Sequence, residues 1–315
     1  MVSAKHEVKK PRVGVVGVGH IGKNHARLYA ELPAAQFTAI YDTDRALAER
    51  IAGEFGVKAA ASLEEFAEQI DAASVATPTT THFEIGRELL ARGKHLLVEK
   101  PIADNTAHAS ELAELAASRA LVLQVGHVER FNPVLGALEK RLTNPRFIEA
   151  HRLSPYPNRS TDIGVVLDLM IHDLEIILHL VHSAVQTIDA VGVPVLSRGE
   201  DIANARLRFE NGCVANITSS RISPEQMRKI RVFQENAYLS LDYQNQSGEM
   251  YRRTAEGLTK EAVEIEREEP LKRQLVSFIE CAATGRAPRV SGFQAAAALE
   301  LAVEITKRIN SVPRG

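Results

Sequence analysis

Short apolar runs alternate with longer segments of helical periodicity through the first third of the chain. A short apolar run between turn signals is typical of a strand buried on both faces, and a 3.6-residue period is typical of a helix that covers it. This regular order of strand and helix predicts a parallel sheet with helices on both faces. The expected strands are Val13–Val16, Phe37–Tyr41, Ala73–Ala76, His95–Val98 and Leu121–Val125, and the expected helices are Ile21–Leu32, Arg45–Phe55, Ser62–Gln69 with Ser62 as N-cap, His82–Arg92 and Ala107–Ser118.

The pattern changes after residue 126. Residues 203–210 alternate strictly between apolar and polar, which predicts a strand with one buried face. Asn211-Gly212 follows, a strong signal for a hairpin, so an antiparallel or mixed sheet with one open face is expected. Further strands are expected at Phe147–Leu153, Val214–Ser219 and within Lys229–Tyr243, and further helices at Val165–Val181, Pro270–Ala283 and Gln294–Ile309.

Together the two patterns predict an α/β protein of two domains, and 315 residues are enough for two cores. Residues 1–126 are expected to form a Rossmann domain with a doubly wound parallel sheet. Residues 127–315 are expected to form an α+β domain for substrate binding and oligomerisation, with a mostly antiparallel open sheet and a final helix that is free to pack back on the first domain. Since an open sheet face commonly packs against a partner subunit, we expect a homo-oligomer, a dimer or a tetramer, through this sheet.

Composition narrows the class of protein. Apolar residues make up 45% and charged residues 25%, as in ordinary globular proteins, and a net charge of -2 disfavours nucleic acid as a partner. The sequence has no apolar run of the roughly 20 residues that a membrane span needs, and Met1–Arg12 lacks the apolar core of a signal peptide. Cys213 and Cys281 are far apart and are expected to be reduced thiols. We therefore expect a cytoplasmic protein without membrane association.

A glycine-rich motif opens the first predicted helix. Gly17-x-Gly19-x-x-Gly22 matches the pattern GxGxxG and lies between a strand and a helix, which is the context of a dinucleotide-binding turn. The first glycine permits a tight turn, the second lets the backbone approach a pyrophosphate, and the third lets helix and strand pack closely. The free N–H groups of the helix N-terminus then face the phosphates.

An acidic residue stands where the second strand ends. Asp42 lies 20 residues beyond Gly22, at the position where a carboxylate accepts hydrogen bonds from the adenosine ribose hydroxyls. A 2′-phosphate there would meet like charge, so NAD is favoured over NADP. Arg45, three residues on, is a cation that weakens this argument.

Two motifs follow later strands of the same sheet. Thr77-Pro78 comes after the third long strand and Glu99-Lys100 after the fourth. Ligands of doubly wound sheets bind beyond the carboxyl ends of the strands, so both motifs are candidates for the cofactor site. A lysine at this edge can polarise a substrate oxygen, although a solvated loop lysine explains the motif equally well.

The long helix of the second domain carries a second candidate for chemistry. Asp168 and His172 are four residues apart and so share one helix face. A carboxylate beside an imidazole stabilises its protonated form, which suits His172 to act as a general base, whereas the alternative is an amphipathic helix with a core histidine. His172, His179 and His182 also permit a metal site, but nothing in the sequence completes the ligand set and no metal is expected.

These pieces together resemble the Gfo/Idh/MocA family of oxidoreductases, named for glucose–fructose oxidoreductase and inositol dehydrogenase. The resemblance implies that Lys100, Asp168 and His172 act on a sugar or cyclitol hydroxyl. One departure is visible, because this chain has Gly164–Leu167 where many members have a glycine-rich stretch before the Asp. The motifs that carry the resemblance are Gly17-x-Gly19-x-x-Gly22, Thr77-Pro78-Thr79, Glu99-Lys100-Pro101 and Asp168-x-x-x-His172.

A narrower resemblance rests on Val125–Pro133 and Asn158–Leu169, which are similar to the bacterial UDP-N-acetylglucosamine 3-dehydrogenase branch of the family. It implies oxidation of the sugar C3 hydroxyl to a ketone, with a partner aminotransferase that makes a 3-amino sugar for lipid A. A nucleotide-sugar diphosphate needs cations, and the guanidinium groups of Arg130 and Arg159 are the candidates, with Asn132 beside them.

The sequence thus predicts an NAD-dependent dehydrogenase of a nucleotide sugar. The alternatives are a dehydrogenase of another polyol (inositol, a free sugar or a UDP-sugar uronate), a nicotinamide-binding regulator without turnover, and a reductase of ferric, haem-like or bilin substrates. The predicted cofactor-binding residues are Gly17, Gly19, His20, Ile21, Gly22, Asp42, Thr77, Pro78, His82, Glu99 and Lys100.

Overall fold

The computed structural model describes residues 10–156 and 163–311, and its chain divides into two compact units. The first unit joins the residues up to His127 with a second segment, Leu271–Ala296, and the second unit comprises Val128–Pro270 and the residues from Ala297 onward. The chain therefore re-enters the first unit at Leu271 and leaves it again after Ala296, which differs from a single boundary at residue 126.

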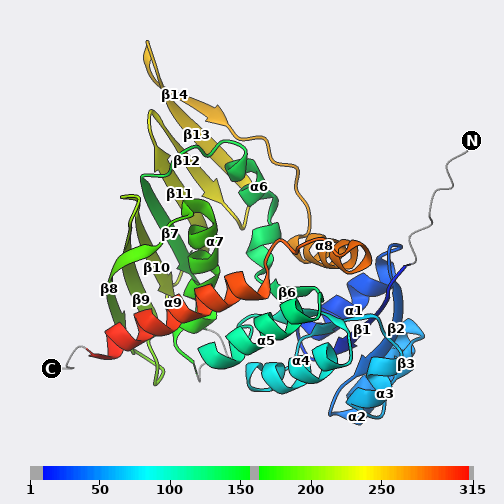
Figure 1. Ribbon diagram of the computed structural model, residues 1–315. Helices are drawn as coiled ribbons and strands as arrows, with labels where there is room; N and C mark the ends of the chain where they lie inside the picture. Colours follow the sequence, from blue (N-terminus) through cyan, green and yellow to red (C-terminus); the bar gives the residue numbers. More distant parts are fainter. Residues whose placement is uncertain (1–9, 157–162, 312–315) are drawn as a thin grey trace, which may run out of the picture. The chain divides into compact units, whose positions relative to one another are not determined.

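A six-stranded parallel sheet forms the centre of the first unit (Figure 1). Its strand order, β3-β2-β1-β4-β5-β6, is that of a doubly wound dinucleotide-binding fold, with β1 at the point where the order reverses. Near-continuous burial of the inner strands agrees with a sheet covered on both faces. The strands are β1 (Arg12–Val16), β2 (Gln36–Tyr41), β3 (Lys58–Ala59), β4 (Ala72–Val75), β5 (His95–Glu99) and β6 (Leu123–Gly126).

Two helices of this unit begin at residues whose side chains cap the helix N-terminus. Asp44 caps α2 by accepting a hydrogen bond from the backbone N–H of Leu47 at 3.0 Å. Ser62 caps α3 by accepting a hydrogen bond from the N–H of Glu65 at 3.1 Å, so the predicted N-cap is confirmed, and the Glu65 carboxylate accepts one from the N–H of Ala61. The helices are α1 (Gly22–Glu31), α2 (Arg45–Phe55), α3 (Leu63–Glu68), α4 (His82–Ala91) after the 3-10 turn η1 (Thr79–Thr81), α5 (Thr106–Ser118) and α8 (Pro270–Thr284).

The apolar side of α8 contributes to the core of the first unit. Leu275 and Phe278 are fully buried in the same cluster as Val13, Leu28 and Ile40. A helix near the end of the sequence thus completes a core that the first strands begin. Local periodicity predicts such a helix but not the unit to which it belongs.

The second unit is built on an eight-stranded sheet in the order β14-β13-β12-β11-β7-β10-β9-β8. Only the pair β7–β10 is parallel, so the prediction of a mostly antiparallel sheet is confirmed. The predicted hairpin at Asn211-Gly212 joins β9 and β10, and Gly212 adopts a φ of +83° there. The strands are β7 (Phe147–Leu153), β8 (Val185–Val193), β9 (Ile202–Phe209), β10 (Val214–Ser220), β11 (Met227–Gln234), β12 (Ala237–Asp242), β13 (Ser247–Thr254) and β14 (Gly257–Ala262).

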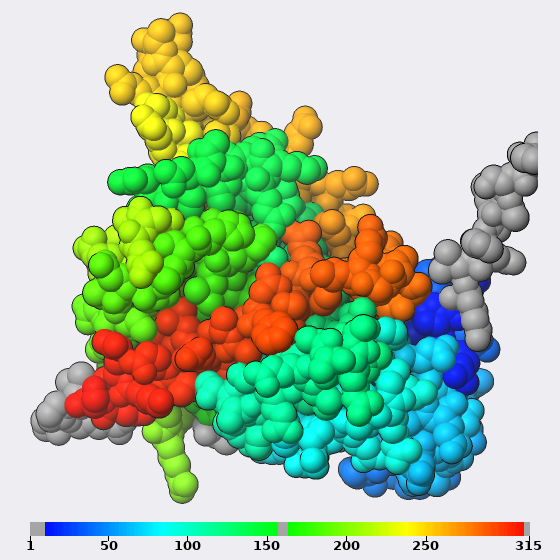
Figure 2. Space-filling model, in the orientation of Figure 1, coloured from blue at the N-terminus to red at the C-terminus, as the bar shows by residue number. Residues whose placement is uncertain are grey.

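Strict alternation of buried and part-exposed residues in β7 and β9 shows that one face of this sheet is covered. Helix α7 lies over that face, and the hairpin β13–β14, whose outer strand is exposed along its whole length, projects at one end of the unit (Figures 1 and 2). The sequence pattern had not predicted β3, β8, β13 or β14. The helices are η2 (Val128–Phe131), α6 (Pro133–Glu139), η3 (Val166–Met170) and α7 (Ile171–Val181). Helix α9 (Gly292–Ser311) begins in the first unit and continues in the second from Ala297.

The long helix expected at Val165–Val181 is not a single α-helix. Its first part, η3, is a π-helix, and the α-helical part begins at Ile171. Such wide turns are rare and occur often at functional sites. This correction concerns the turn that carries Asp168.

Candidate active site

The glycine motif forms the tight turn between β1 and α1. Gly17 has a φ of +80°, and its N–H donates to the carbonyl oxygen of Tyr41 at 2.8 Å. A Cβ at Gly22 would collide with the carbonyl oxygen of Gly17, whereas a Cβ at Gly19 would meet open space. The third glycine therefore permits the close packing, and the second leaves the backbone accessible to a ligand. The first turn of α1, within Gly22–Glu31, carries no acidic residue that would repel a phosphate.

Asp42 organises this turn from the end of β2. Its Oδ2 accepts a hydrogen bond from the N–H of Val18 at 2.8 Å, and its Oδ1 accepts one from Asp44 at 2.9 Å. Each carboxylate oxygen can accept a further bond, so both roles, loop support and ribose binding, are compatible. Arg45 donates to Glu49 at 2.7 Å along α2, and this pairing weakens its claim as a ligand for a 2′-phosphate. The turn and Asp42 together fit NAD.

Further predicted residues lie at the same carboxyl edge of the sheet. Thr77-Pro78 follows β4, and Glu99 is the last residue of β5, followed by Lys100. In β6, Gly126 pairs with Glu99, and a Cβ there would lie only 2.6 Å from Glu99 Oε1. Gly126 thus leaves room for the carboxylate. The structure brings the cofactor candidates of the first unit to one edge.

His82, the first residue of α4, links two of these loops. Its Nδ1 lies 2.8 Å from the carbonyl oxygen of Pro101, and its Nε2 lies 2.9 Å from that of Thr77. Carbonyl oxygens only accept, so both contacts are hydrogen bonds only when the ring is protonated. Burial lowers the pKa of His82, which favours the neutral ring with a single donor. The histidine therefore tethers the two loops and is too buried to be a surface ligand.

A second buried histidine supports Glu99 from α1. His25 Nδ1 lies 3.0 Å from Ser74 Oγ, and His25 Nε2 lies 3.2 Å from Glu99 Oε1. The hydroxyl of Tyr29 also reaches Ser74 Oγ, at 2.7 Å. This contact chain runs from the helix of the glycine motif to the end of β5, and the sequence pattern gave no signal for it beyond a polar residue on a buried helix face.

In the second unit, Asp168 lies inside the π-turn η3 and His172 is the second residue of α7. Both side chains are half-buried. Asp173, the next residue, is buried and receives two hydrogen bonds from Arg152 of β7, at 2.9 and 3.0 Å. A bidentate guanidinium–carboxylate pair is directional, so it fixes the rotation of the helix beside His172.

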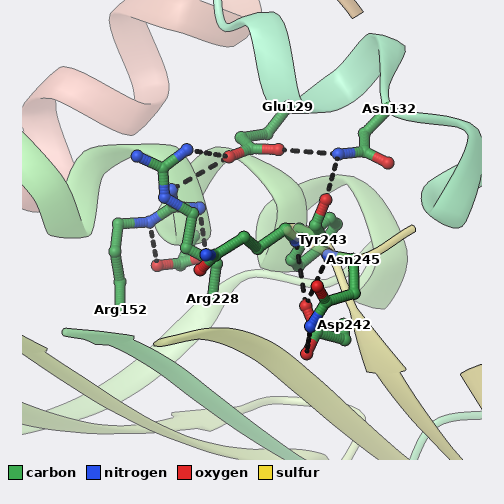
Figure 3. A network of polar contacts seen from close by, with 9 residues as sticks. Glu129, Asn132, Arg152, Arg228, Asp242, Tyr243 and Asn245 are labelled. Carbon is green, nitrogen blue, oxygen red and sulfur yellow. Dashed lines mark hydrogen bonds and ion pairs between the residues drawn. The ribbon is translucent and has the colours of Figure 1, made fainter. Parts of the chain in front are cut away.

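The pair extends into the buried network of Figure 3. Arg152 Nη1 also donates to Glu129 at 3.1 Å, and Arg228 approaches the same carboxylate at 3.4 Å. Burial alone would raise the pKa of Glu129, but Arg152 and Arg228 lower it. Asn132 connects Glu129 to the carbonyl oxygen of Tyr243, both at 3.1 Å. The guanidinium groups of Arg152 and Arg228 balance the carboxylates of Glu129 and Asp173, and these ion pairs connect η2, β7 and α7.

The predicted substrate cations are placed differently from expectation. Arg130 is 2% exposed and its Nε lies 3.3 Å from Glu175, with Glu139 at 3.9 Å from Nη1. Asn132 is likewise buried, in the contacts just described. The assignment of Arg130 and Asn132 to a substrate diphosphate stays a prediction. The burial of both side chains and the ion pair of Arg130 with Glu175 disfavour it. Arg159 lies outside the described residues.

The histidines of the second unit also permitted a metal site in the sequence analysis. Among residues 10–156 and 163–311, no three or more His, Cys, Asp or Glu side chains are grouped to hold a metal ion. His179 instead lies 2.8 Å from Glu139 and edge-on to the ring of His182. No helix in the described part of the chain is long and apolar enough to span a membrane.

Comparison with protein families decides the class. Residues 11–127 match the oxidoreductase family with an NAD-binding Rossmann fold, and residues 138–240 match the GFO/IDH/MocA C-terminal domain. The chain belongs to the Gfo/Idh/MocA family. It is therefore an oxidoreductase of that family with NAD as its cofactor, and the fold, enzyme class and cofactor predicted from the sequence are confirmed.

Individual Gfo/Idh/MocA proteins are similar over most of this chain. UDP-N-acetylglucosamine 3-dehydrogenase of Acidithiobacillus ferrooxidans is 35% identical over 93% of this chain and 96% of its own. A solved structure of that enzyme has a TM-score of 0.92 at 34% identity, over 96% of this chain and 99% of the other. The scyllo-inositol 2-dehydrogenase (NAD(+)) of Bacillus subtilis is 26% identical over 70% of this chain and 69% of its own.

A more distant structure shares the fold. GenD2 from gentamicin A biosynthesis, solved in complex with NAD, has a TM-score of 0.83 at 22% identity and covers 99% of this chain and 97% of its own. At that identity the likeness concerns the architecture alone. These relatives together establish a dehydrogenase related to enzymes that act on sugar and polyol hydroxyls.

Proposed function

We propose that this enzyme oxidises a ring hydroxyl of a nucleotide sugar to a ketone, with UDP-N-acetylglucosamine at C3 as the substrate. The observation that supports this most is the similarity, over 93% of the chain, to an enzyme named for that reaction. Inositol dehydrogenases are less similar and match about two thirds of the chain. The ketone product is suited to amination, so we infer that it feeds amino-sugar synthesis for lipid A.

Oxidation of a secondary alcohol releases a hydride from carbon and a proton from oxygen. We assign the proton to His172, because histidine is the side chain that most often serves as a general base. Asp168, four residues earlier, supports the protonated ring, since a carboxylate near an imidazolium lowers its energy. This order of groups, carboxylate then histidine, gives the proton a defined acceptor.

The first unit contributes the cofactor site and one cation. When bound, NAD supplies the hydride acceptor. We assign Lys100 to the reacting oxygen, where an ammonium polarises the C–O bond as negative charge develops. Glu99, beside His25 and opposite Gly126, holds the segment that presents this lysine.

The test is a mixture of the purified protein, NAD and UDP-N-acetylglucosamine, followed by NADH absorbance and product mass. Because alcohol oxidation can lie uphill, a sugar aminotransferase with an amine donor is included to consume the ketone. A product lighter by about 2 Da, or its aminated descendant, together with NADH formation supports the proposal.

Other outcomes assign the enzyme elsewhere. Turnover of inositol, a free sugar or a UDP-uronate, with silence on UDP-N-acetylglucosamine, keeps the dehydrogenase and rejects the nucleotide sugar. Measurable NAD binding without turnover of any polyol favours a regulator. A matched Asp168→Asn variant tests whether any observed turnover depends on the proposed chemistry.

We also propose that the chain forms a homo-oligomer through the open face of the eight-stranded sheet. A cross-strand row of half-buried rings lies on that face, formed by Phe147, Phe233, Tyr238 and Tyr251. Light scattering is expected to give two or four times the chain mass of 34.5 kDa, and Tyr238→Glu is expected to lower it. A wild-type mass of one chain contradicts this proposal.

A further inference from the structure

The connection between β8 and β9 reaches the start of the helix that carries Asp168 and His172. The backbone carbonyl of Glu200 accepts a hydrogen bond from the N–H of Val165 at 2.9 Å, and its side-chain Oε1 accepts one from Val166 at 3.2 Å. Glu200 is 5% exposed. One residue, distant in sequence, therefore takes up two backbone donors at the beginning of the helix.

The β8–β9 connection approaches the start of the π-turn so closely that each of the two segments has a glycine at the contact, Gly199 and Gly164. A Cβ at Gly164 would fall on the carboxylate of Glu200, and a Cβ at Gly199 would lie 3.0 Å from the Cα of Gly164. The carbonyl oxygen of Gly164 also accepts a hydrogen bond from the N–H of Asp168, at 3.2 Å. The backbone beside Glu200 thus connects directly to the residue that precedes His172 by four positions.

Asp201 holds the connection in one conformation. Its Oδ2 accepts hydrogen bonds from three consecutive backbone N–H groups, those of residues 195–197, at 2.6–2.8 Å. Its Oδ1 accepts one from Arg221 at 2.9 Å, and both side chains are completely buried. Burial would raise the pKa of Asp201, but the backbone donors and Arg221 lower it. The loop that presents Glu200 is therefore a fixed support.

The helix has no side-chain cap of its own. Neither Val165, which precedes the π-turn, nor Met170, which precedes α7, makes a side-chain hydrogen bond to the helix start. An acceptor at that place stabilises the start of a helix, and a carboxylate there also opposes the positive end of the helix dipole. Glu200 supplies both from another element.

We infer that Glu200 is a positioning residue that sets the direction of Asp168 and His172 by capping the π-turn from the β8–β9 connection. The inference deepens the proposed function, on which the roles of Asp168 and His172 rest. Because the π-turn bears Asp168 and leads into His172, a shift of its first residues moves both side chains. A displacement of about 1 Å at a catalytic group can cost roughly 100-fold in rate.

The test compares Glu200→Ala with Glu200→Gln, which keeps a side-chain oxygen of the same reach. For the alanine variant we expect kcat to fall by about 10- to 100-fold with the dissociation constant of NAD within about twofold of wild type. The glutamine variant is expected to recover most of kcat. Glu235→Ala, at an exposed glutamate of the β11–β12 turn, is the matched control.

Backbone hydrogen exchange of residues 164–173 adds a measurement that needs no substrate. Glu200→Ala is expected to speed exchange in this segment, Glu200→Gln to restore it, and Glu235→Ala to leave it unchanged. Gly164→Ala, which displaces the carboxylate, is expected to reproduce the alanine phenotype while Glu200 is present. If packing alone matters, the double variant Gly164→Ala/Glu200→Ala recovers kcat because the new methyl group fills the vacated space.

Three results overturn the inference: unchanged kcat and exchange in Glu200→Ala, recovery of kcat in the double variant, or an equal loss in Glu200→Gln accompanied by a lower melting temperature. Absence of turnover by the wild-type enzyme on every sugar rejects the proposed function instead. The exchange comparison then still decides whether Glu200 holds the π-turn.

Discussion

The two units hold their candidate site residues in different ways. In the first unit, the backbone places the candidate cofactor residues, through the glycine turn and the ends of the strands. Single carboxylates such as Asp42 support these turns from within a few residues of a strand. In the second unit, charged side chains from segments distant in the sequence contact the helix with His172: Arg152 of β7 donates to Asp173, and Glu200 of the β8–β9 connection accepts from Val166. A site placed by the backbone tolerates substitution of many side chains. A buried charged side chain, in contrast, destabilises the fold when its partner is removed.

Each unit is therefore vulnerable to a different kind of substitution. A cofactor turn needs room, so it is damaged by added atoms. A helix held by buried ion pairs is damaged by removed charges, because the remaining partner stays desolvated. Substitutions in the two units are therefore expected to damage different properties of the protein.

Loss of the imidazole should separate chemistry from cofactor binding. His172→Ala is expected to lower kcat by about 10³-fold, within the range for a lost general base, since the hydroxyl proton then has no acceptor. NAD affinity, measured by calorimetry, should remain near that of wild type because the glycine turn belongs to the other unit. Full activity in this variant removes His172 from the mechanism.

Removal of one buried guanidinium should damage the second unit most in stability. Arg152→Met leaves Asp173 and Glu129 buried without it and is expected to lower the free energy of unfolding by about 3–5 kcal/mol. Arg228→Met is the matched control, since its side chain is 44% exposed and a pair of that kind contributes under about 1 kcal/mol. Chemical denaturation measures both, and equal losses would contradict a special role for the buried pair.

An added methyl group should damage the first unit in cofactor binding. Gly22→Ala is expected to weaken NAD binding by about 100-fold, since its Cβ collides with the Gly17 carbonyl and distorts the phosphate turn. Gly53→Ala, in α2, meets open space and is expected to be neutral or to stabilise by about 0.5–1 kcal/mol. Equal NAD affinity in the two variants would show that the turn can relax.

A smaller, pH-dependent effect concerns His95 in β5. Its Nδ1 accepts a hydrogen bond from the N–H of Val122 at 3.0 Å, and burial lowers its pKa below 6.5. Below that pH the unfolded chain takes up a proton that the folded chain resists, so stability rises with pH and is lost on acidification. His82 and His179 act in the same direction.

The variant His95→Asn keeps an acceptor for Val122 and removes the titrating group. Its melting temperature should therefore fall less than that of wild type between pH 7 and pH 5. Differential scanning calorimetry at matched ionic strength gives the comparison. Parallel losses in both proteins would assign the acid sensitivity to the other histidines.

Much of the first unit was predictable because its signals are local. Apolar runs, helix caps such as Ser62 and the spacing of Gly17, Gly19 and Gly22 each concern a few neighbouring residues, and the backbone obeys them directly. The spacing of Asp168 and His172 predicted a shared helix face, which stays a prediction, and the π-turn that contains Asp168 was not predicted.

Part of the second unit carried signals that only the tertiary structure explains. Arg152 occupies a position of β7 where the alternation of Ile148 and Ala150 calls for an apolar residue, a sign of a buried charge whose partner the sequence does not name. Arg130 was expected to meet a diphosphate, yet it lies against Glu175.

Local patterns in the sequence alone determined most strands and helices of the first unit, the cofactor turn and the residue types available for chemistry, because these follow from neighbouring residues. The tertiary structure decided that α8 completes the first core, that Arg152 clamps Asp173 and that Glu200 caps the π-turn. Those contacts join residues more than 20 positions apart. Their formation depends on how sheets and helices pack, which local periodicity does not encode.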